Sequence, residues 1–321
     1  MITTHPIEID EPTIKEPKSA REVTLASGRV VSLAEMSVSE LQSLQWQQEQ
    51  LCAQEIMKHP KGSRERGLAI RQAYDLICTI LAAQSADAGQ PLVMGLDPRY
   101  VRLVLNLLRQ QREAGLPHPA LFEIGYGCGA LLSEVHAHGY PGGGIEVSEI
   151  MRAQAIELLG KRHASALLLG DLRSVDLDSL ADRPTLIYWN DVLEHIPPDE
   201  IGDYVSHIYR LLAPGGTLVT ITPNWILRPS DVTGDFCPPR TEARGLHLKE
   251  YRLAEVTPLL RQAGFRRVAS PLLATHQRLV VCGSGGRALK QCIEPLLDHL
   301  PVRAARLMCR GLAMSATIAR K

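Results

Sequence analysis

The sequence lacks several features that would assign it to a common protein class. Aromatic residues make up only 4% of its 321 residues, and the formal net charge is zero. There is therefore no global basic field of the kind that nucleic-acid binding usually needs. No apolar run approaches the roughly 20 residues of a membrane-spanning helix. The first twenty residues contain four acidic residues and no apolar run, which is unlike a secretory signal. We therefore expect no nucleic-acid partner and no transmembrane segment.

The sequence also lacks a regular cysteine pattern, although seven cysteines are present. They are scattered, odd in number and without CxxC spacing. A disulfide framework or a structural zinc site would normally show paired, regular spacings. The simplest interpretation is a reduced, cytoplasmic protein in which no metal site is expected. The apolar content of 45% is what a globular core requires.

A glycine-rich segment follows a short apolar stretch in the middle of the chain. Residues 121–124 lead into Gly125, Gly127 and Gly129, and apolar residues at helical spacing follow. This order predicts a strand, a tight turn and a helix. Glycine suits the turn because it accepts unusual φ/ψ angles and lets the backbone approach a ligand without a Cβ in the way. A second short strand ends at Glu146, about where nucleotide-binding βαβ units place a carboxylate for ribose hydroxyls.

The glycine motif alone leaves several interpretations open. Residues 125–130 satisfy both GxGxG and GxGxxA, so a nicotinamide- or flavin-binding fold fits the pattern. A glycine-rich turn with no ligand fits it too. The rest of the chain has to decide between them.

Predicted strands alternate with predicted helices through residues 118–285, which form the expected main domain. Alternation implies an α/β fold with a doubly wound, mostly parallel seven-stranded sheet and helices on both faces. The last two strands have no helix between them, which predicts an antiparallel pair at one edge. Ligands bind such sheets at the carboxyl ends of the strands. The predicted strands are 121–125, 143–147, 165–170, 185–190, 216–222, 265–270 and 276–282, and the helices are 129–138, 149–160, 174–180, 199–212 and 251–263.

The segments on either side of this domain have simpler patterns. Residues 1–36 are expected to form an arm and a hairpin, and 37–117 a helical extension. That extension begins at a capping box of Ser37 and Glu40. Its last helix has Asp97 as N-cap, followed by Pro98.

The C-terminal tail, residues 286–321, has apolar positions at helical spacing and seven Lys or Arg against two acidic residues. It predicts basic amphipathic helices that bind an anionic surface, or helices that pack on the sheet or on the second copy of a homodimer.

Two further motifs resolve the ambiguity of the glycine loop. Residues 186–197 read LIYWNDVLEHIP, and residues 211–218 read LLAPGGTL. Together with the glycine loop, Glu146 and the carboxylate of Asp171 after the third strand, they resemble class I S-adenosylmethionine-dependent methyltransferases. The resemblance is to the branch that acts on small molecules and ubiquinone precursors, and it covers residues 118–285. It implies S-adenosyl-L-methionine as cofactor.

The resemblance also implies a role for individual residues. The glycine turn passes under the methionine moiety, Glu123 orients its ammonium group, and Glu146 accepts both ribose hydroxyls. Asp171 accepts the adenine amino group, and Asn190 and Asp191 line the methyl-donor side. The cofactor residues expected in this way are Glu123, Gly125, Tyr126, Gly127, Gly129, Glu146, Val147, Asp171, Leu172, Asn190 and Asp191.

Two histidines are candidates for the catalytic base. His195 follows the strand that borders the substrate in the resembling family, and His247 lies in GLHLKEY before a predicted helix. With an ordinary pKa of about 6.5, either could accept a proton from the acceptor. His195 could equally brace a loop. Methyl transfer needs no strong base when the sulfonium is positioned in line with the acceptor.

The long segment 223–250 is the expected substrate region, because structureless loops of this length are usually functional. Tyr100, Asn224, Trp225, Arg228 and His247 are its candidate substrate contacts. Residues 94–100 on the other side of the cleft could complete a lid that excludes water. The alternative is that 37–115 only covers a sheet edge or makes a dimer contact.

These observations predict an enzyme that moves a methyl group to O, N or C of a small metabolite or natural-product intermediate. Two alternatives remain: a non-catalytic regulatory subunit that binds the nucleoside, and a methyltransferase acting on tRNA or protein. Neutral charge and the lack of a basic, aromatic-interleaved stripe speak against RNA.

Overall fold

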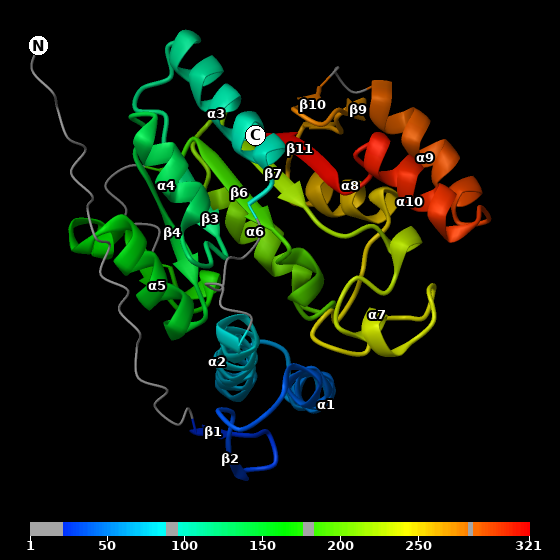
Figure 1. Cartoon of the computed structure of the whole chain (residues 1–321). Helices are drawn as coiled ribbons and strands as arrows, with labels where there is room; N and C mark the ends of the chain where they lie inside the picture. The colour runs from blue at the N-terminus through cyan, green and yellow to red at the C-terminus, as the bar shows by residue number, and fades with distance from the viewer. Residues whose placement is uncertain (1–21, 88–95, 176–182, 282–284) are drawn as a thin grey trace, which may run out of the picture.

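The computed structural model describes residues 22–87, 96–175, 183–281 and 285–321. Its centre is a seven-stranded sheet in the order β5-β4-β3-β6-β7-β11-β8 (Figure 1). All neighbouring pairs are parallel except those made by β11, which runs antiparallel to both β7 and β8. The strands are β3 (Leu121–Ile124), β4 (Gly142–Glu146), β5 (Leu167–Leu169), β6 (Leu186–Asn190), β7 (Thr217–Ile221), β8 (Arg267–Ala269) and β11 (Ala316–Arg320).

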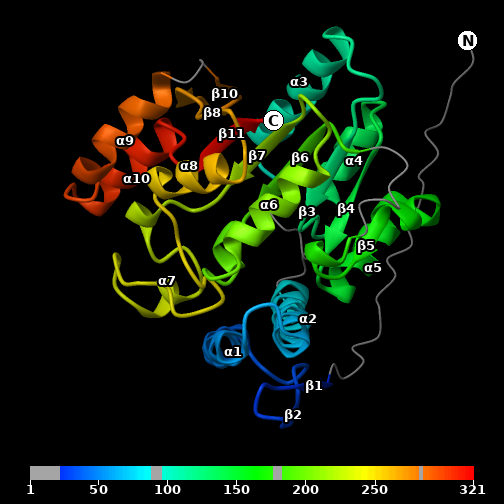
Figure 2. The ribbon, with the colours of Figure 1, turned by 180° about the vertical axis from the view of Figure 1, so that it is seen from behind.

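Helices cover both faces of this sheet, as predicted for a doubly wound fold. One face packs α3 (Pro98–Glu113), α4 (Ala130–Ala137) and α5 (Glu149–Leu159) against strand residues such as Tyr188. The other face packs α6 (Ile201–Leu211) and α8 (Leu253–Gln262) against residues such as Ile187 (Figure 2). Successive strand residues point to opposite faces, so each buried strand supplies both cores.

The capping signals read from the sequence are present in the structure. Helix α1 (Val38–Lys58) begins with a complete capping box between Ser37 and Glu40. Asp97 caps α3 by accepting a hydrogen bond from the Arg99 backbone N–H, and Pro98 is the first helical residue. The predicted hairpin is formed by β1 (Glu22–Thr24) and β2 (Val30–Ser32). The second predicted helix is α2 (Arg64–Asp87).

The seventh strand is not the one that the sequence suggested. The expected strand 276–282 is wrong as a member of the main sheet, because its described part holds only β10 (Leu279–Val280), which pairs with β9 (Leu273–Ala274). The missing strand is β11, at the end of the tail. The tail is helical as predicted in α9 (Gly285–Leu297) and α10 (Val302–Gly311), and the chain then enters the sheet between β7 and β8.

The tail helices pack on the main domain. Leu297, Ala305, Cys309 and Met314 join Ile226 and Leu253 in a buried cluster. This favours the interpretation of the tail as a packed element. None of the described helices combines the length and apolarity that a bilayer crossing requires.

Helices α1 and α2 form a hairpin that lies beyond the carboxyl ends of the strands (Figures 1 and 2). The long loop 223–250 packs against this hairpin: the Leu246 N–H donates to Glu49 Oε2 at 3.1 Å, and Trp46 stacks on Phe236. Arg66 of α2 is buried and forms ion pairs with Asp199 and Glu200 at the start of α6. These contacts fix the hairpin as a roof over the sheet edge.

Candidate active site

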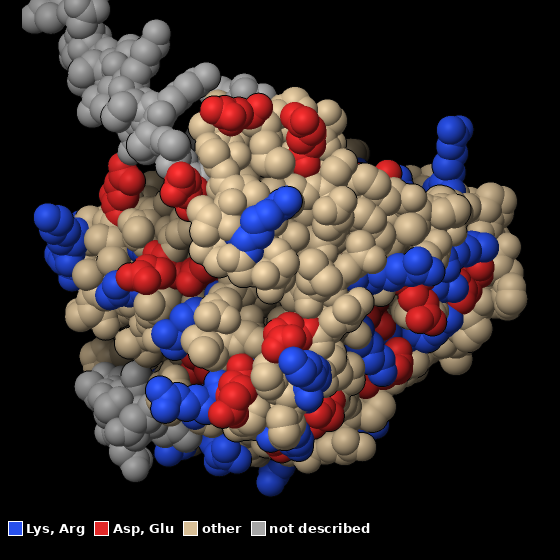
Figure 3. All heavy atoms as spheres, turned by 90° about the horizontal axis from the view of Figure 1, so that it is seen from below, with Lys and Arg blue, Asp and Glu red and all other residues tan. Residues whose placement is uncertain are grey.

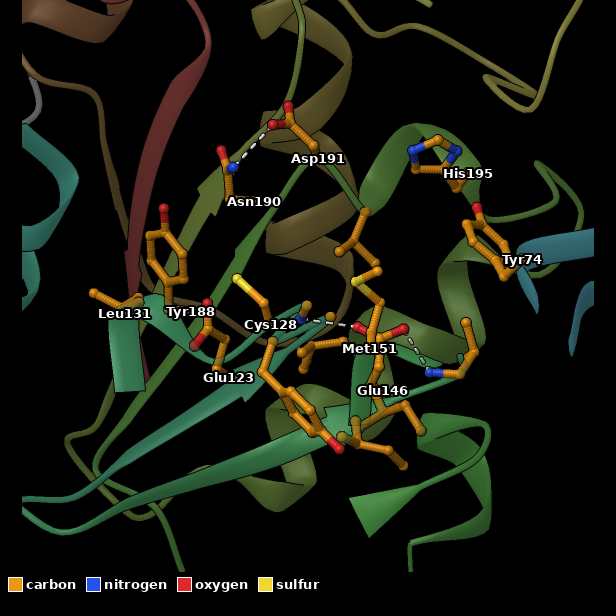
Figure 4. A pocket seen from close by; sticks show the side chains of 18 of the residues that line it. Tyr74, Glu123, Cys128, Leu131, Glu146, Met151, Tyr188, Asn190, Asp191 and His195 are labelled. Carbon is orange, nitrogen blue, oxygen red and sulfur yellow. Dashed lines mark hydrogen bonds between the residues drawn. The ribbon is translucent and has the colours of Figure 1, made fainter. Parts of the chain in front are cut away.

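A cavity of about 260 Å³ lies under this roof, at the carboxyl ends of β3, β4 and β6 (Figure 4). The sheet order reverses direction between β3 and β6, and open α/β sheets bind ligands at such a point. The cavity is lined by every predicted cofactor residue except Gly129 and Asp171, namely Glu123, Gly125, Tyr126, Gly127, Glu146, Val147, Leu172, Asn190 and Asp191.

The glycine loop requires glycine at Gly125 for two reasons. Its φ is +70°, in the left-handed region, and a Cβ there would lie 2.6 Å from Val192 Cγ2. Gly127 also has positive φ, and its N–H donates to Glu146. Gly129 lies outside the cavity and serves packing, because a Cβ would crowd Ala155 and Leu159 of α5 at 3.1 Å. The loop can therefore bring backbone within contact distance of a ligand.

Glu146 is a buried carboxylate that the local backbone satisfies. It accepts N–H bonds from Gly127 at 2.9 Å, Val147 at 2.8 Å and Ser148 at 3.1 Å. Burial raises its pKa, and the three N–H donors oppose that shift. The donors fix the carboxylate at the cavity wall, where its remaining lone pairs can accept ribose hydroxyls.

Glu123 faces the same cavity and is 7% exposed. Its Oε2 has no hydrogen-bond partner among the described residues. Burial, reinforced by the charge of Glu146, raises its pKa well above the usual range. A buried carboxyl oxygen without a donor is costly, so this position fits a ligand that brings a cationic donor such as an ammonium group.

The opposite wall of the cavity is the end of β6. Asn190 Nδ2 donates to Asp191 Oδ2 at 2.8 Å (Figure 4). Asp191 has a φ of +52°, unusual for a residue with a Cβ, and its carboxylate opens onto the cavity. The surrounding protein partly shields the Asp191 carboxylate from water, and this desolvation raises its pKa. The turn thus presents a carboxylate to the space above the glycine loop.

Behind this turn lies a cluster of Glu194, His195 and His247. His195 lines the cavity, and its Nδ1 donates to the Leu246 carbonyl at 2.9 Å. Burial lowers its pKa to about 3, so its imidazole is neutral at physiological pH. Burial, together with the charge of Asp191, raises the pKa of Glu194 to about 8. Burial opposes protonation of His247, but its hydrogen bond to Glu250 and the charges of the neighbouring carboxylates together outweigh burial and raise its pKa.

Asp171 does not reach the cavity in this structure. Its carboxylate caps the short helix Leu172–Ser174, forms an ion pair with Arg173 at 2.8 Å and accepts from the Tyr204 hydroxyl at 2.7 Å. Burial opposes ionisation, but these donors hold the pKa of Asp171 below its usual value. The proposed contact of Asp171 with adenine stays a prediction, and it would require these bonds to rearrange.

A second cavity of about 520 Å³ adjoins the first and shares Asp97, Asn190 and Asp191 with it. Of the predicted substrate residues, Tyr100 and Asn224 line it. The Asn224 amide, however, is engaged by Glu294 Oε1, the Met314 carbonyl and the Ile226 N–H.

The remaining predicted substrate residues lie outside both cavities. The Arg228 guanidinium lies 4.2 Å from the Trp225 ring centroid and pairs with Asp298 at 3.1 Å. Trp225 and His247 line a separate surface hollow with Glu250. The structure therefore does not bring Trp225 and Arg228 to the cofactor cavity.

The part of the cavity wall that α2 forms was not predicted from the sequence. Ile70, Tyr74 and Cys78 of α2 line the cofactor cavity. Met151 of α5 lines it too, with a polarisable side chain suited to contact a flat ring. Only the helical spacing of these apolar residues was visible in the sequence. Leu96 and Asp97 from the predicted lid 94–100 also line the cavity, whereas residues 94 and 95 lie outside the described part of the chain.

The comparisons with known proteins can now be set against this geometry. The sequence profile of a family described as a methyltransferase domain matches residues 96–270, more than half of the chain. The chain belongs to this family. The class I recognition and the α/β fold are thereby confirmed, and the matched range includes the whole cofactor cavity except its α2 wall.

Curated relatives cover part of this methyltransferase. Carboxy-S-adenosyl-L-methionine synthase of Pseudomonas paraeruginosa is 29% identical over 129 residues, which is 38% of this chain and 51% of that protein. The chain thus spans about half the length of the curated relatives it matches.

Parts of the chain are also similar to solved structures. A SAM-dependent methyltransferase from Archaeoglobus fulgidus is 19% identical with a TM-score of 0.41, over 69% of this chain and 94% of that one. An O-methyltransferase family protein from Burkholderia thailandensis is 15% identical with a TM-score of 0.44, over 88% and 70%.

The cofactor of this family is S-adenosyl-L-methionine, and the cavity fits it. The unpartnered Glu123 Oε2 suits its ammonium group, and the crowded turn at Gly125 leaves room for backbone contact only. The fixed Glu146 carboxylate suits its ribose. The nicotinamide and flavin interpretations of the glycine motif are thus set aside.

Proposed function

We propose that this chain transfers the methyl group of S-adenosylmethionine to a small-molecule acceptor. The observation that carries the proposal is the joining of two cavities at Asn190 and Asp191. One cavity has the acceptors that a bound nucleoside and an ammonium group need. The other opens from the same turn and is about 520 Å³ in volume.

In this proposal the chain mainly positions the reactants. When bound, the cofactor supplies an activated methyl group on a sulfonium. Glu146 and Glu123 fix its two ends, and the Asn190–Asp191 turn sets where the acceptor atom stands relative to the sulfur. Alignment of this kind can contribute several kcal/mol, on the order of 7 or more, to lowering a barrier. His195, neutral and half-buried at the cavity wall, offers one acceptor nitrogen beside this space.

The second cavity, called the acceptor cavity from here on, supports an anionic acceptor. Its lining includes Arg99, Arg306 and Arg310. Arg99 pairs with Asp97, whereas Arg306 and Arg310 form no ion pair with any described residue. Guanidinium groups bind carboxylate or phosphate through two parallel hydrogen bonds. Replacing both Arg306 and Arg310 by Ala should raise the acceptor KM by about tenfold or more while the affinity for the demethylated cofactor stays constant.

A carboxylated sulfonium product, as the name of the Pseudomonas relative indicates for that protein, is less well supported here. Such a product adds a carboxylate beside the sulfur. The described lining of the cofactor cavity contains no Lys or Arg to face that charge. Nucleic-acid substrates are also disfavoured. Figure 3 shows the roof side of the molecule with Lys, Arg, Asp and Glu intermixed, without a continuous basic surface.

The decisive experiment incubates the full chain with methyl-labelled S-adenosylmethionine and a cell extract, and then separates the products by size. Label is expected in the small-molecule fraction and is expected to disappear with the Glu146→Ala variant. Label confined to macromolecules would contradict the small acceptor. Binding of the cofactor without any transferred label would favour the non-catalytic subunit.

A further inference from the structure

Three side chains behind the cofactor cavity bring possible metal-ligand atoms close together. Glu194, His195 and His247 each offer one ligand atom, and all of these lie within 4.8 Å of one another. Glu194 is completely buried, and its Oε1 has no hydrogen-bond partner in the described part of the chain. His247 Nε2 lies 4.0 Å from that oxygen.

The bonds around the cluster fix which atoms face inward. His195 Nδ1 bonds to the Leu246 carbonyl, which can only accept, so Nδ1 carries the proton and Nε2 holds the lone pair. His247 Nδ1 bonds to Glu250 Oε1 at 3.1 Å and is fixed in the same way. Glu194 Oε2 accepts from the Thr222 hydroxyl at 2.9 Å, which leaves Oε1 free.

These partners have the pattern that surrounds metal ligands. Histidines that bind a metal through one nitrogen usually donate the other N–H to a carboxylate or a backbone carbonyl. Glu250 does this for His247 and Leu246 for His195, and Glu250 is itself fixed by the Ser230 N–H at 2.7 Å. Buried acceptor atoms that lack a hydrogen-bond donor are energetically unfavourable, and a bound cation would stabilise the three that meet here.

We propose that Glu194, His195 and His247 bind one divalent transition-metal ion, with Asp191 as a further ligand or as the partner of a metal-bound water. Two imidazoles favour ions such as Zn²⁺, Co²⁺ or Fe²⁺ over Mg²⁺ and Ca²⁺. A tetrahedral ion with bonds of about 2.1 Å keeps its ligand atoms about 3.4 Å apart, so closure requires side-chain shifts of about an ångström. The cysteine spacings predicted no metal site, and they contain no information about this cluster.

The position of the ion suggests what it does. His195 lines the cofactor cavity and Asp191 lines both cavities, so one edge of the cluster adjoins the place where the two cavities meet, whereas Glu194 and His247 lie behind it. An open coordination position there would bind an oxygen of the acceptor and favour its deprotonation. This role rests on the proposed function, whereas metal binding itself does not.

Metal binding is tested on the full chain after chelator treatment, by titration calorimetry with Zn²⁺ alone and by visible absorption with Co²⁺. One equivalent of Zn²⁺ is expected to bind, at least about tenfold more tightly than Mg²⁺, and Co²⁺ is expected to show the absorption of a site with nitrogen ligands. Failure of both ions to bind stoichiometrically would overturn the proposal and leave a proton as the cation that the cluster holds.

The ligands are tested with Glu194→Gln and His247→Ala, and with His276→Ala, an exposed histidine outside the cluster, as the matched control. The first two should weaken Zn²⁺ binding by about 100-fold or more, and the control should leave it unchanged. Glu250→Gln, which replaces the charged acceptor of His247 Nδ1 by a neutral one, should weaken it by about 10-fold or more. Unchanged Zn²⁺ affinity in Glu194→Gln and His247→Ala would overturn the site.

Binding of S-adenosylhomocysteine to the same samples separates this proposal from the proposed function. Retained nucleoside binding with lost metal binding supports the metal site in a folded protein. Metal binding without nucleoside binding would contradict the proposed function and leave the metal site standing.

Discussion

Two buried carboxylates differ in how the chain satisfies them: Glu146 lines the cofactor cavity, and Glu194 lies behind its wall. Glu146, at the end of β4, receives three backbone N–H bonds from residues close in sequence or in the adjoining loop. Glu194, just beyond β6, receives one hydroxyl bond and keeps an unpartnered oxygen beside two imidazoles. The carboxylate of Glu146 is satisfied by its own βαβ unit, whereas one oxygen of Glu194 has no hydrogen-bond partner in the described part of the chain. The difference separates the proposed nucleoside site, whose carboxylate is already fixed, from the proposed metal site, whose carboxylate keeps one oxygen for a cation.

The largest effect is expected at Glu146, the carboxylate that the backbone satisfies. Glu146→Ala removes two charge-assisted hydrogen bonds to ribose, worth about 3 kcal/mol together, so affinity for S-adenosylhomocysteine should fall on the order of 100-fold. Titration calorimetry measures it. Glu149→Ala, which changes an exposed carboxylate three residues away, should bind as the parent does. Equal affinities for the two variants would show that Glu146 does not hold the ribose.

The next effect tests the turn that carries Glu146's donor. Gly125→Ala forces a left-handed backbone onto alanine and drives its Cβ against Val192, which should cost about 2–4 kcal/mol of unfolding free energy. Gly139→Ala has a similar φ, +75°, with open space around the new Cβ, and should cost only about 1 kcal/mol. Chemical denaturation compares them, and equal losses would mean that the close approach to Val192 is unimportant.

A smaller effect concerns Asp171, whose carboxylate the structure directs to Arg173 and Tyr204. Asp171→Asn should lower the unfolding free energy by about 1–2 kcal/mol, because those donors lose a charged acceptor. Its affinity for S-adenosylhomocysteine, measured by calorimetry, should stay within about threefold of the parent. That is a change of about 0.7 kcal/mol or less in binding free energy. A loss comparable to that of Glu146→Ala would support the predicted contact of Asp171 with adenine.

The smallest effect should appear in the two segments that were predicted to form a lid. Residues 96–97 line the cofactor cavity, and the segment 223–250 lines the second cavity and packs against the α1–α2 hairpin. Binding of S-adenosylhomocysteine should slow amide hydrogen exchange in 96–100 and in 223–250 by about threefold or more. Exchange of the hairpin at 22–32, far from the cavity, serves as the internal reference. If both segments exchange as fast with the nucleoside as without it, the lid interpretation fails and the roof is only structural.

The sequence predicted the parts of the site that are local. The glycine turn, Glu146 and the polar end of β6 follow directly from short motifs, and the structure places them around one cavity. The strand β11 was missed because its five residues, ATIAR, follow a strong helical pattern and pair with β7 and β8, which lie about a hundred and about fifty residues earlier in the chain. Local pattern contains no information about such pairing.

Long-range contacts also explain the other differences. Tyr74 and Cys78 reach the cavity only because the α1–α2 hairpin folds over the sheet edge and is fixed there by Arg66. His247 joins His195 because Leu246, 51 residues later in the chain, accepts the His195 bond. Asn224 and Arg228 were expected at the substrate, but α9 and the residues that follow it supply partners, Glu294 and Asp298, that engage them.

The measurement that tests the account most directly is titration of the full chain with S-adenosylhomocysteine, S-adenosylmethionine and NADH under the same conditions. The account predicts one equivalent of each of the first two, with micromolar or tighter affinity, about 8 kcal/mol, and no NADH binding. Binding of NADH without either sulfur nucleoside would contradict the assignment of Glu123, Gly125 and Glu146 to an S-adenosylmethionine site, and with it the proposed methyl transfer.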